Sequence, residues 1–195
     1  MADAQPDAIA LLKADHRKVE DLFAKFETAR EADTKKRLAK QICTELTVHT
    51  ILEEEIFYPA CKGEIEDDLI SEAYVEHDSA KVLIAELEAG SPAEEFYDAK
   101  VKVLSEQIEH HVHEEEKRSE GMFSQARAVG VDMDDLGARM LARKQVTPCP
   151  VAQAGSPLRR SDDVGEQHGR EHAIVVQRLM LAGDELLHRH RTSPV

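Results

Sequence analysis

The hydrophobic residues of this chain recur at steps of three and four along four successive stretches. These stretches cover about residues 7–31, 35–61, 64–89 and 91–115. Steps of three and four return to the same side of an α-helix, so each stretch is predicted to be a helix with one apolar face. Four such helices bury their apolar faces by packing against each other. The pattern therefore predicts an all-α protein built on a four-helix bundle.

Turn and capping residues separate the predicted helices. Pro59 and Gly63 are expected to end the second helix, and Gly90 is expected to follow the third. The sequence Ser91-Pro92-Ala93-Glu94 combines an N-cap serine, a proline at the first helical position and a glutamate three residues after the cap. This is the pattern of a capping box, so we predict that the fourth helix begins here. Asp33 and Thr34 are expected to cap the second helix.

The pattern changes after the fourth helix. A short segment at 122–128 and a helix capped by Asp132 and ending near 145 are expected to pack across one end of the bundle. Residues 146–165 are rich in proline, glycine and small polar residues, which is typical of a linker. Residues 166–195 contain a last amphipathic helix, which docks on the bundle, mediates self-association or is poorly ordered. We therefore divide the chain into a bundle with capping helices at 1–145, a linker and a C-terminal helix.

Composition and charge restrict the partners. The formal net charge is −14, with 39 acidic and 25 basic residues. Such a surface repels nucleic acid and anionic lipid and favours cations as partners. Cys43, Cys61 and Cys149 are odd in number and lack CxxC spacing, so no disulfide framework is expected. The first residues have neither the basic region nor the apolar stretch of a signal peptide, and we expect no segment that crosses a membrane. We expect a soluble cytoplasmic protein.

Histidines and glutamates interrupt the apolar faces at matched positions. The six candidate ligands are His16, His49, Glu53, His77, His111 and Glu115. The second and fourth helices each carry a histidine followed four residues later by a glutamate, which places the two side chains on one face about one turn apart. The first and third helices each carry one histidine within the apolar stripe. Side chains from all four helices are therefore expected to meet in the core.

These residue types in this arrangement indicate a metal centre. Imidazole and carboxylate ligands hold iron and its neighbours in the divalent series, and a carboxylate can bridge two cations. A single inward histidine is more often a hydrogen-bonded core residue than a ligand. An ionised glutamate buried without a cation, however, costs roughly several kcal/mol. Because two glutamates and four histidines share one core, we predict that they bind metal.

Helix geometry chooses among the neighbouring acidic residues. Glu53 lies about 40° around the helix from His49, whereas Glu54 is displaced by about a further 100°. Glu116 is displaced from Glu115 in the same way. We therefore predict that Glu54 and Glu116 face away from the metal and that replacing them changes metal binding little, with a supporting role for Glu54 or Glu114 as the alternative. Two tyrosines near inward faces, Tyr74 and Tyr97, are candidates for a phenolate ligand or for hydrogen-bonded core residues.

Taken together, His16, the pair His49-x-x-x-Glu53, His77 and the pair His111-x-x-x-Glu115 resemble the hemerythrin-like family with its HHE cation-binding signature. The resemblance covers about residues 8–125. It implies an up-down four-helix bundle with two non-haem iron ions, oxo- or hydroxo-bridged, that bind or sense dioxygen, nitric oxide or peroxide or handle iron. The histidines would be terminal ligands and the two glutamates would bridge the irons.

One departure from the family separates two functional hypotheses. Oxygen-carrying members have a second histidine four residues from the first on the third helix, but the corresponding neighbours of His77 are Ala73 and Lys81. The first hypothesis is a non-catalytic di-iron protein that binds a small ligand or handles iron. The second is a di-iron enzyme of oxidase or peroxidase type that uses the open coordination positions. No HExxH motif is present, which argues against a zinc hydrolase, and His168 and His172 in the tail are expected to be surface residues.

Overall fold

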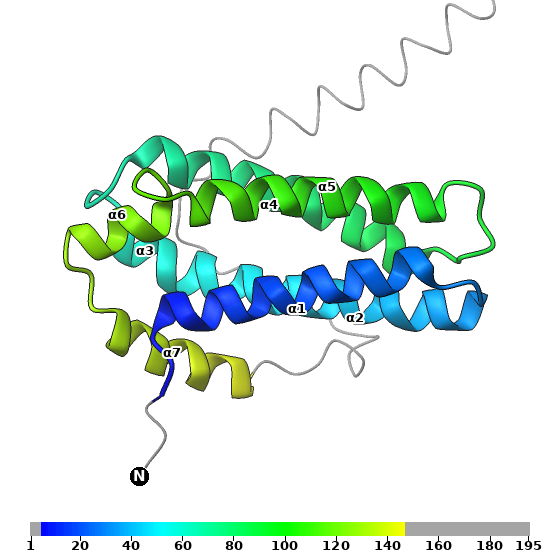
Figure 1. Ribbon diagram of the computed structural model, residues 1–195, viewed down its shortest axis with the longest axis horizontal. Helices are drawn as coiled ribbons and strands as arrows, with labels where there is room; N and C mark the ends of the chain where they lie inside the picture. The colour runs from blue at the N-terminus through cyan, green and yellow to red at the C-terminus, as the bar shows by residue number, and fades with distance from the viewer. Residues whose placement is uncertain (1–4, 147–195) are drawn as a thin grey trace, which may run out of the picture. The chain divides into compact units, whose positions relative to one another are not determined.

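The computed structural model describes residues 5–146, and all regular structure within that range is helical (Figure 1). Four long helices form the body: α1 (Ala8–Thr28), α2 (Ala32–Leu52), α4 (Asp67–Ala89) and α5 (Tyr97–Glu116). Four shorter elements complete it: the π-helical turn η1 (Glu53–Phe57), α3 (Tyr58–Cys61), α6 (Met122–Ala128) and α7 (Met133–Val146). The predicted all-α bundle is confirmed. The predicted C-terminal helix, and the linker from residue 147 onward, lie outside the described residues.

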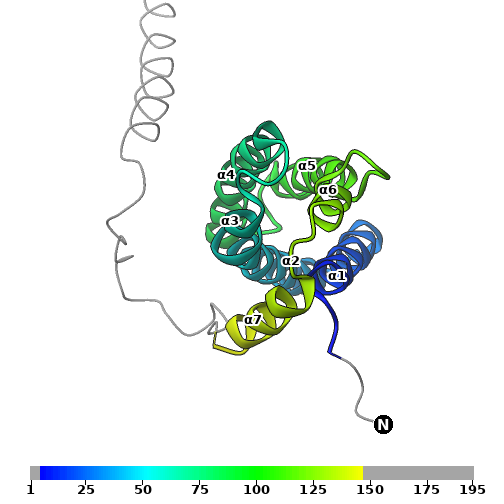
Figure 2. The same cartoon turned by 90° about the vertical axis from the view of Figure 1, so that its left-hand side faces the viewer.

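The direction of each long helix follows from the two apolar clusters that it joins. The first cluster contains Leu12 of α1, Leu52 of α2 and Ala73 of α4. The second contains residues further along α1 and α4 but earlier along α2, among them Val19, Ala80 and Leu46. Successive helices therefore run between the clusters in alternating directions, with α5 leaving the second cluster. This is the up-down topology, and Figure 2 shows the four helices arranged around a common centre.

A widened π-turn interrupts the helical run from Ala32 to Cys61. The backbone N–H of Tyr58 donates to the carbonyl of Glu53, five residues earlier. Pro59 follows directly. Proline has no N–H, and in a regular α-helix its ring clashes with the carbonyl four residues earlier. The extra residue of the π-turn accommodates this proline, so the helix continues to Cys61 with its register shifted.

The predicted start of the fourth bundle helix was wrong by five residues. Ser91 does form a turn, since its Oγ accepts the N–H of Ala93 at 3.4 Å and its carbonyl accepts the N–H of Glu94 at 2.9 Å. Phe96 then has non-helical backbone angles and a 64% exposed side chain, and α5 begins at Tyr97, which is buried. Helical turns in proteins depend on packing of an apolar face. The residues that follow Ser91 offer no buried apolar face before Tyr97, so no helix forms there. The expected capping by Asp33 and Thr34 was also wrong, because α2 begins at Ala32 after Glu31.

The helix α7 packs along α1 and α2 (Figure 2). Asp132 caps it as predicted, because its Oδ1 accepts the N–H of Asp135 at 3.0 Å. Gly137 permits the close approach to α1: a Cβ atom there would lie 2.6 Å from the carbonyl oxygen of Pro6. Ion pairs fasten the far end of α7 to the bundle, including Lys144 to both oxygens of Asp15 at 2.5 and 2.7 Å. Within residues 5–146, no helix has the length and hydropathy needed to cross a membrane.

Candidate metal centre

The six predicted ligands form a polar layer between the two apolar clusters. All are buried, with exposed fractions from 0% for Glu53 to 5% for His49. Each lies where the apolar face of its helix predicts an inward side chain; His16, for example, follows Leu12 by one turn and precedes Val19. The sequence periodicity thus predicted the burial of all six side chains. Their role as metal ligands is a separate proposal, developed below.

The Nε2 atoms of the four histidines point toward one another in two pairs. The Nε2 atoms of His16 and His49 are 3.0 Å apart, and those of His77 and His111 are 3.2 Å apart. Glu53 Oε2 lies 3.2 Å from His49 Nε2 and 3.3 Å from His77 Nε2, so this carboxylate stands between the pairs. Two overlapping groups of donors result, each with its ligand atoms within 4.8 Å of one another. They are His16, His49, Glu53 and Glu115, and Glu53, His77 and His111.

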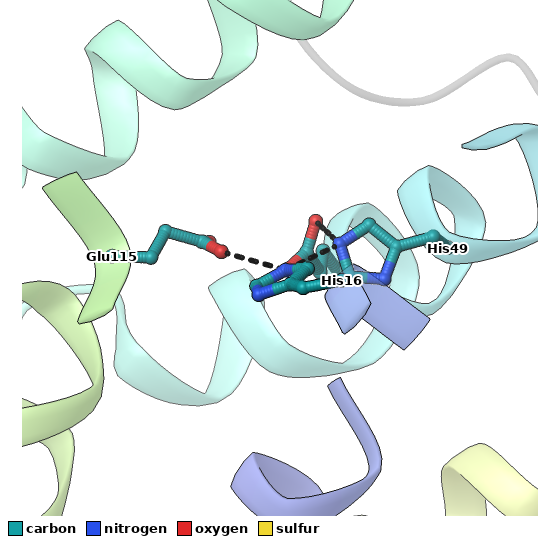
Figure 3. A group of neighbouring side chains, drawn as sticks. His16, His49 and Glu115 are labelled. Atoms are coloured by element: carbon teal, nitrogen blue, oxygen red, sulfur yellow. Dashed lines mark hydrogen bonds and ion pairs between the residues drawn. The ribbon is translucent and has the colours of Figure 1, made fainter. Parts of the chain in front are cut away.

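Glu115 reaches the same centre from the opposite side of the bundle. Its Oε2 lies 3.4 Å from His16 Nε2 and 3.7 Å from His111 Nε2. Figure 3 shows this side chain pointing across from α5 toward His16, with His49 beside it. Each carboxylate therefore faces histidines from both halves of the bundle, which is the placement that a bridging ligand needs.

Each histidine turns its other ring nitrogen, Nδ1, toward a carboxylate at the edge of the layer. We call these four residues the supporting carboxylates: Glu116 for His16, Asp15 for His49, Glu54 for His77 and Glu76 for His111. The Nδ1 atom donates to Glu116 at 2.8 Å, to Glu54 at 3.1 Å and to Glu76 at 2.7 Å. Asp15 is more distant, 3.9 Å from His49 Nδ1. Carboxylates that hold the outer nitrogen of a histidine fix the ring orientation and increase its basicity toward a metal.

The supporting carboxylates determine which histidine nitrogen is available to a cation. An ionised carboxylate can only accept a hydrogen bond, so the Nδ1 atoms that face one carry the hydrogen. A neutral imidazole then has a bare lone pair on Nε2. Two such lone pairs 3.0 Å apart repel each other unless a proton or a metal cation lies between them. The donor arrangement therefore fits a cation at each histidine pair.

The two central carboxylates lack sufficient partners among the described residues. Glu53 Oε1 and Glu115 Oε2 are buried and make no hydrogen bond there. Burial and the negative charge of Glu53 raise the pKa of Glu115. Burial also acts to raise the pKa of Glu53, but the charge of His49 and hydrogen bonds from the histidines lower it well below its usual value. Two carboxylates that compete for the same histidines are both satisfied when cations are bound between them.

Histidine pKa values show the same competition within the first pair. Burial and the positive charge of His49 lower the pKa of His16 to about 4. For His49, burial acts to lower the pKa, but the carboxylate of Glu53 raises it to about 10. One positive charge is thus favoured in the pair and a second is disfavoured. A metal cation supplies that positive charge without protonating either ring.

Tyr58 is a residue of this centre that sequence reasoning missed. Its hydroxyl lies 3.2 Å from Glu115 Oε1 and 3.4 Å from both Glu53 Oε2 and His77 Nε2. Tyr58 follows Glu53 by five residues, which in a regular α-helix points it about 140° away. The π-turn restores the alignment, because one of its turns contains an additional residue. The sequence did contain one signal for this π-turn: Pro59, directly after Tyr58, disfavours a regular α-helix there.

The other flanking residues agree with expectation only in part. Tyr97 is buried within the second apolar cluster, in line with its alternative as a core residue, whereas Tyr74 is 37% exposed; the hydroxyl at the centre is that of Tyr58. Glu116 accepts a hydrogen bond from His16 and does not point away into water. Glu54 takes the supporting role that was the alternative for it. Spacing along one helix could not reveal these contacts, because each donor histidine lies on a different helix.

A small cavity adjoins the four histidines. Its volume is about 20 Å³. Most of the remaining wall is apolar, and Asp15 and Thr50 are its other polar residues; the apolar side chains are Val19, Leu46, Ala80, Ile108 and Val112. A volume of this size holds little more than one water-sized molecule. The centre thus adjoins an apolar space that fits only a very small ligand.

Comparisons with known proteins identify the family and the fold of this chain. The family model of the hemerythrin HHE cation binding domain matches residues 7–122. A crystal structure of a hemerythrin HHE cation binding domain-containing protein from Mycobacterium kansasii has the same fold, with a TM-score of 0.60 and 22% identity, covering 72% of this chain and 86% of that one. A DNA nickase from Nostoc sp. (strain PCC 7120) is 28% identical over 106 residues, 54% of this chain, and the match spans only 30% of that protein.

The family match extends from the residue before α1 to the first residue of α6, and it contains all six of the converging side chains. It also covers more than half of the chain. The chain therefore belongs to the hemerythrin HHE cation-binding domain family.

Proposed function

We propose that this protein holds two non-haem iron ions and binds a small ligand, such as dioxygen, nitric oxide or peroxide, beside them. His16 and His49 would hold one ion, His77 and His111 the other, and Glu53 and Glu115 would bridge them. The observation that carries the proposal is the convergence of four Nε2 atoms on two buried carboxylates while carboxylates hold three of the four Nδ1 atoms at hydrogen-bonding distance. Mixed imidazole and carboxylate donors suit iron.

The surroundings of the centre support a small ligand. The apolar cavity beside the histidines has a volume of about 20 Å³, which accommodates a diatomic molecule or peroxide but no organic substrate. The second donor group offers only three residues, Glu53, His77 and His111. Iron bound there would have coordination positions left for an external ligand. When bound, the irons would supply reversible ligand binding and electron transfer.

Metal analysis tests this proposal. Protein produced with sufficient iron is expected to contain two irons per folded chain. Glu53→Ala and Glu115→Ala are expected to lose most of this iron, because each removes a carboxylate shared by both metal positions. Glu109→Ala, which removes an exposed charge from the same helix as Glu115, is the matched control. Protein that contains no iron, or a single zinc, would refute the proposal.

Tyr58 favours a di-iron enzyme of oxidase or peroxidase type as the second candidate. A catalytic centre for these reactions needs a protonated group that donates a hydrogen bond beside the reacting atoms, and the Tyr58 hydroxyl lies 3.2 Å from Glu115 Oε1. Burial and the charges of Glu115 and Glu53 raise its pKa well above the usual value, so the hydroxyl keeps its proton. The iron-loaded protein can be tested for peroxide consumption with an added electron donor. Turnover that is lost in Tyr58→Phe at full iron content would favour the enzyme over the binding protein.

A further inference from the structure

One of the four supporting carboxylates lacks the positive partner that the other three have. Lys13 and Arg17 pair with Glu116, Lys144 pairs with Asp15, and Lys81 pairs with Glu54. Glu76 forms no ion pair with a lysine or arginine of residues 5–146. Its Oε2 accepts from His111, and its Oε1 lies 3.4 Å from Nε2 of His110, a surface residue. The edge of the polar layer at Glu76 is therefore the one where negative charge is left without a lysine or arginine.

Glu76 also belongs to a second group of possible metal ligands. Ligand atoms of Glu72, Glu76 and His110 lie within 4.8 Å of one another. Glu72 precedes Glu76 by one turn of α4, and His110 lies opposite on α5. Glu72 and His110 are exposed and Glu76 is half-buried, so the group extends from the protein surface inward.

Two cavities meet at Glu76. An open groove of about 400 Å³ between α4 and α5 is lined by Glu76, Gln107 and His110. A second, much smaller cavity of about 10 Å³ is lined by Glu72, Glu76, Glu114, Glu115 and His111. No lysine or arginine lines either cavity. Glu76 thus stands between the solvent and two of the proposed inner ligands.

Oxygen atoms without partners lie along the same path. Gln107 donates its amide to Ser79 Oγ, but its own buried Oε1 accepts no hydrogen bond from the described residues. Glu115, which is 2% exposed, lines the smaller cavity; its Oε2 accepts no hydrogen bond from the described residues and faces Nε2 of His16 at 3.4 Å, at the inner end of this path. Buried acceptors normally have a partner, and a passing cation with its water molecules would provide one.

We propose that Glu72, Glu76 and His110 form an outer cation site through which divalent metal reaches the inner centre. This inference rests on the proposed function, because it concerns how that centre is filled. Carboxylate and imidazole together suit Fe²⁺. Negative charge without a lysine or arginine beside it attracts cations to this edge of a protein with a formal net charge of −14. The path then leads past Glu76 to His111 and Glu115.

The rate of metal uptake tests the outer site. Metal-free full-length protein is mixed anaerobically with Fe²⁺, and uptake is followed over time and to completion. The variants are Glu72→Gln, His110→Gln and the double variant, since these exposed residues lie outside the inner ligand set. Glu109→Gln and His113→Gln make the same chemical changes at exposed positions elsewhere on α5 and serve as matched controls.

We expect the double variant to take up iron about tenfold more slowly, a change at the lower end of the effect of electrostatic focusing on association rates. Its final iron content should equal that of the wild type, and both control variants should load at the wild-type rate. Protein already filled with Zn²⁺ should bind an additional, weaker Mn²⁺ by electron paramagnetic resonance, and the double variant should not. Equal uptake rates in all variants, without additional Mn²⁺ in the wild type, would overturn the outer site. A wild type that takes up no metal would instead refute the proposed function.

Discussion

Replacing Glu116 or Glu54 by glutamine should weaken metal binding although neither residue belongs to the proposed ligand set. Each accepts a hydrogen bond from the Nδ1 atom of a histidine, at 2.8 Å for Glu116 and 3.1 Å for Glu54. The bond holds the ring so that Nε2 points into the centre. This expectation is the opposite of the one that helix spacing alone gave for Glu116.

The structure sets the size of the effect. Loss of the group that holds the outer nitrogen of a ligating histidine typically lowers metal affinity about 10- to 100-fold. That corresponds to roughly 1.4 to 2.7 kcal/mol. Glutamine keeps a carbonyl that accepts from Nδ1 but loses the charge that increases imidazole basicity. We therefore expect about tenfold weaker binding for Glu116→Gln and Glu54→Gln, and up to about 100-fold for the alanine variants.

The assay is competition for metal against a chromophoric chelator, with the iron content measured per folded chain. Glu109→Gln serves as the control, because it removes an exposed glutamate on α5. Helix content by circular dichroism establishes that each variant is folded. If Glu116→Gln and Glu54→Gln bind metal as tightly as Glu109→Gln, the carboxylates do not orient the histidines, and the tautomer assignment of the centre fails.

Three further predictions follow from other contacts. Tyr58→Phe should keep the iron content but alter the absorption bands of the iron-loaded protein, because it removes the hydroxyl 3.2 Å from Glu115; an unchanged spectrum would separate Tyr58 from the centre. Lys144→Met should weaken metal binding about 3- to 10-fold, because Lys144 holds both oxygens of Asp15 beside His49. Lys144→Arg should bind metal as tightly as the wild type, and equal affinity in all three proteins would refute the link between Lys144 and His49. Truncation after Gln145 should leave two irons per chain, because every proposed ligand precedes Glu116; a folded truncated protein without iron would show that the tail contributes to the centre.

The sequence alone was sufficient to predict the bundle and the burial of the six candidate ligands. Both depend on the helical period, which the long helices obey: His111 and Glu115 continue the apolar face of Val101 and Leu104 without a break. Periodicity gives the side of each helix that faces inward. When the four inward faces meet, inward residues at the same level along the bundle axis must be neighbours.

Features that depend on departures from the regular period could not be predicted in this way. The position of Tyr58 requires the π-turn, in which the step between aligned residues is five instead of four. The start of α5 depends on packing at Tyr97 and not on the local capping pattern at Ser91. The hydrogen bond from His16 to Glu116 joins residues 100 positions apart. Such contacts can be identified only once the packing of the helices is known.

The alternation of helix directions described above gives the bundle an internal two-fold repeat. The hairpin α1–α2 supplies His16 and, 33 residues later, His49, while α4–α5 supplies His77 and, 34 residues later, His111. Within residues 5–146 the π-turn follows the first hairpin and has no counterpart after the second, and it places Tyr58 next to His77. The repeat therefore provides two similar groups of donors, and the π-turn makes them chemically different, because it places the Tyr58 hydroxyl beside His77. If metal binds as proposed, the two positions differ in their surroundings, and a half-filled protein is expected to hold its cation at the group with four donors, His16, His49, Glu53 and Glu115.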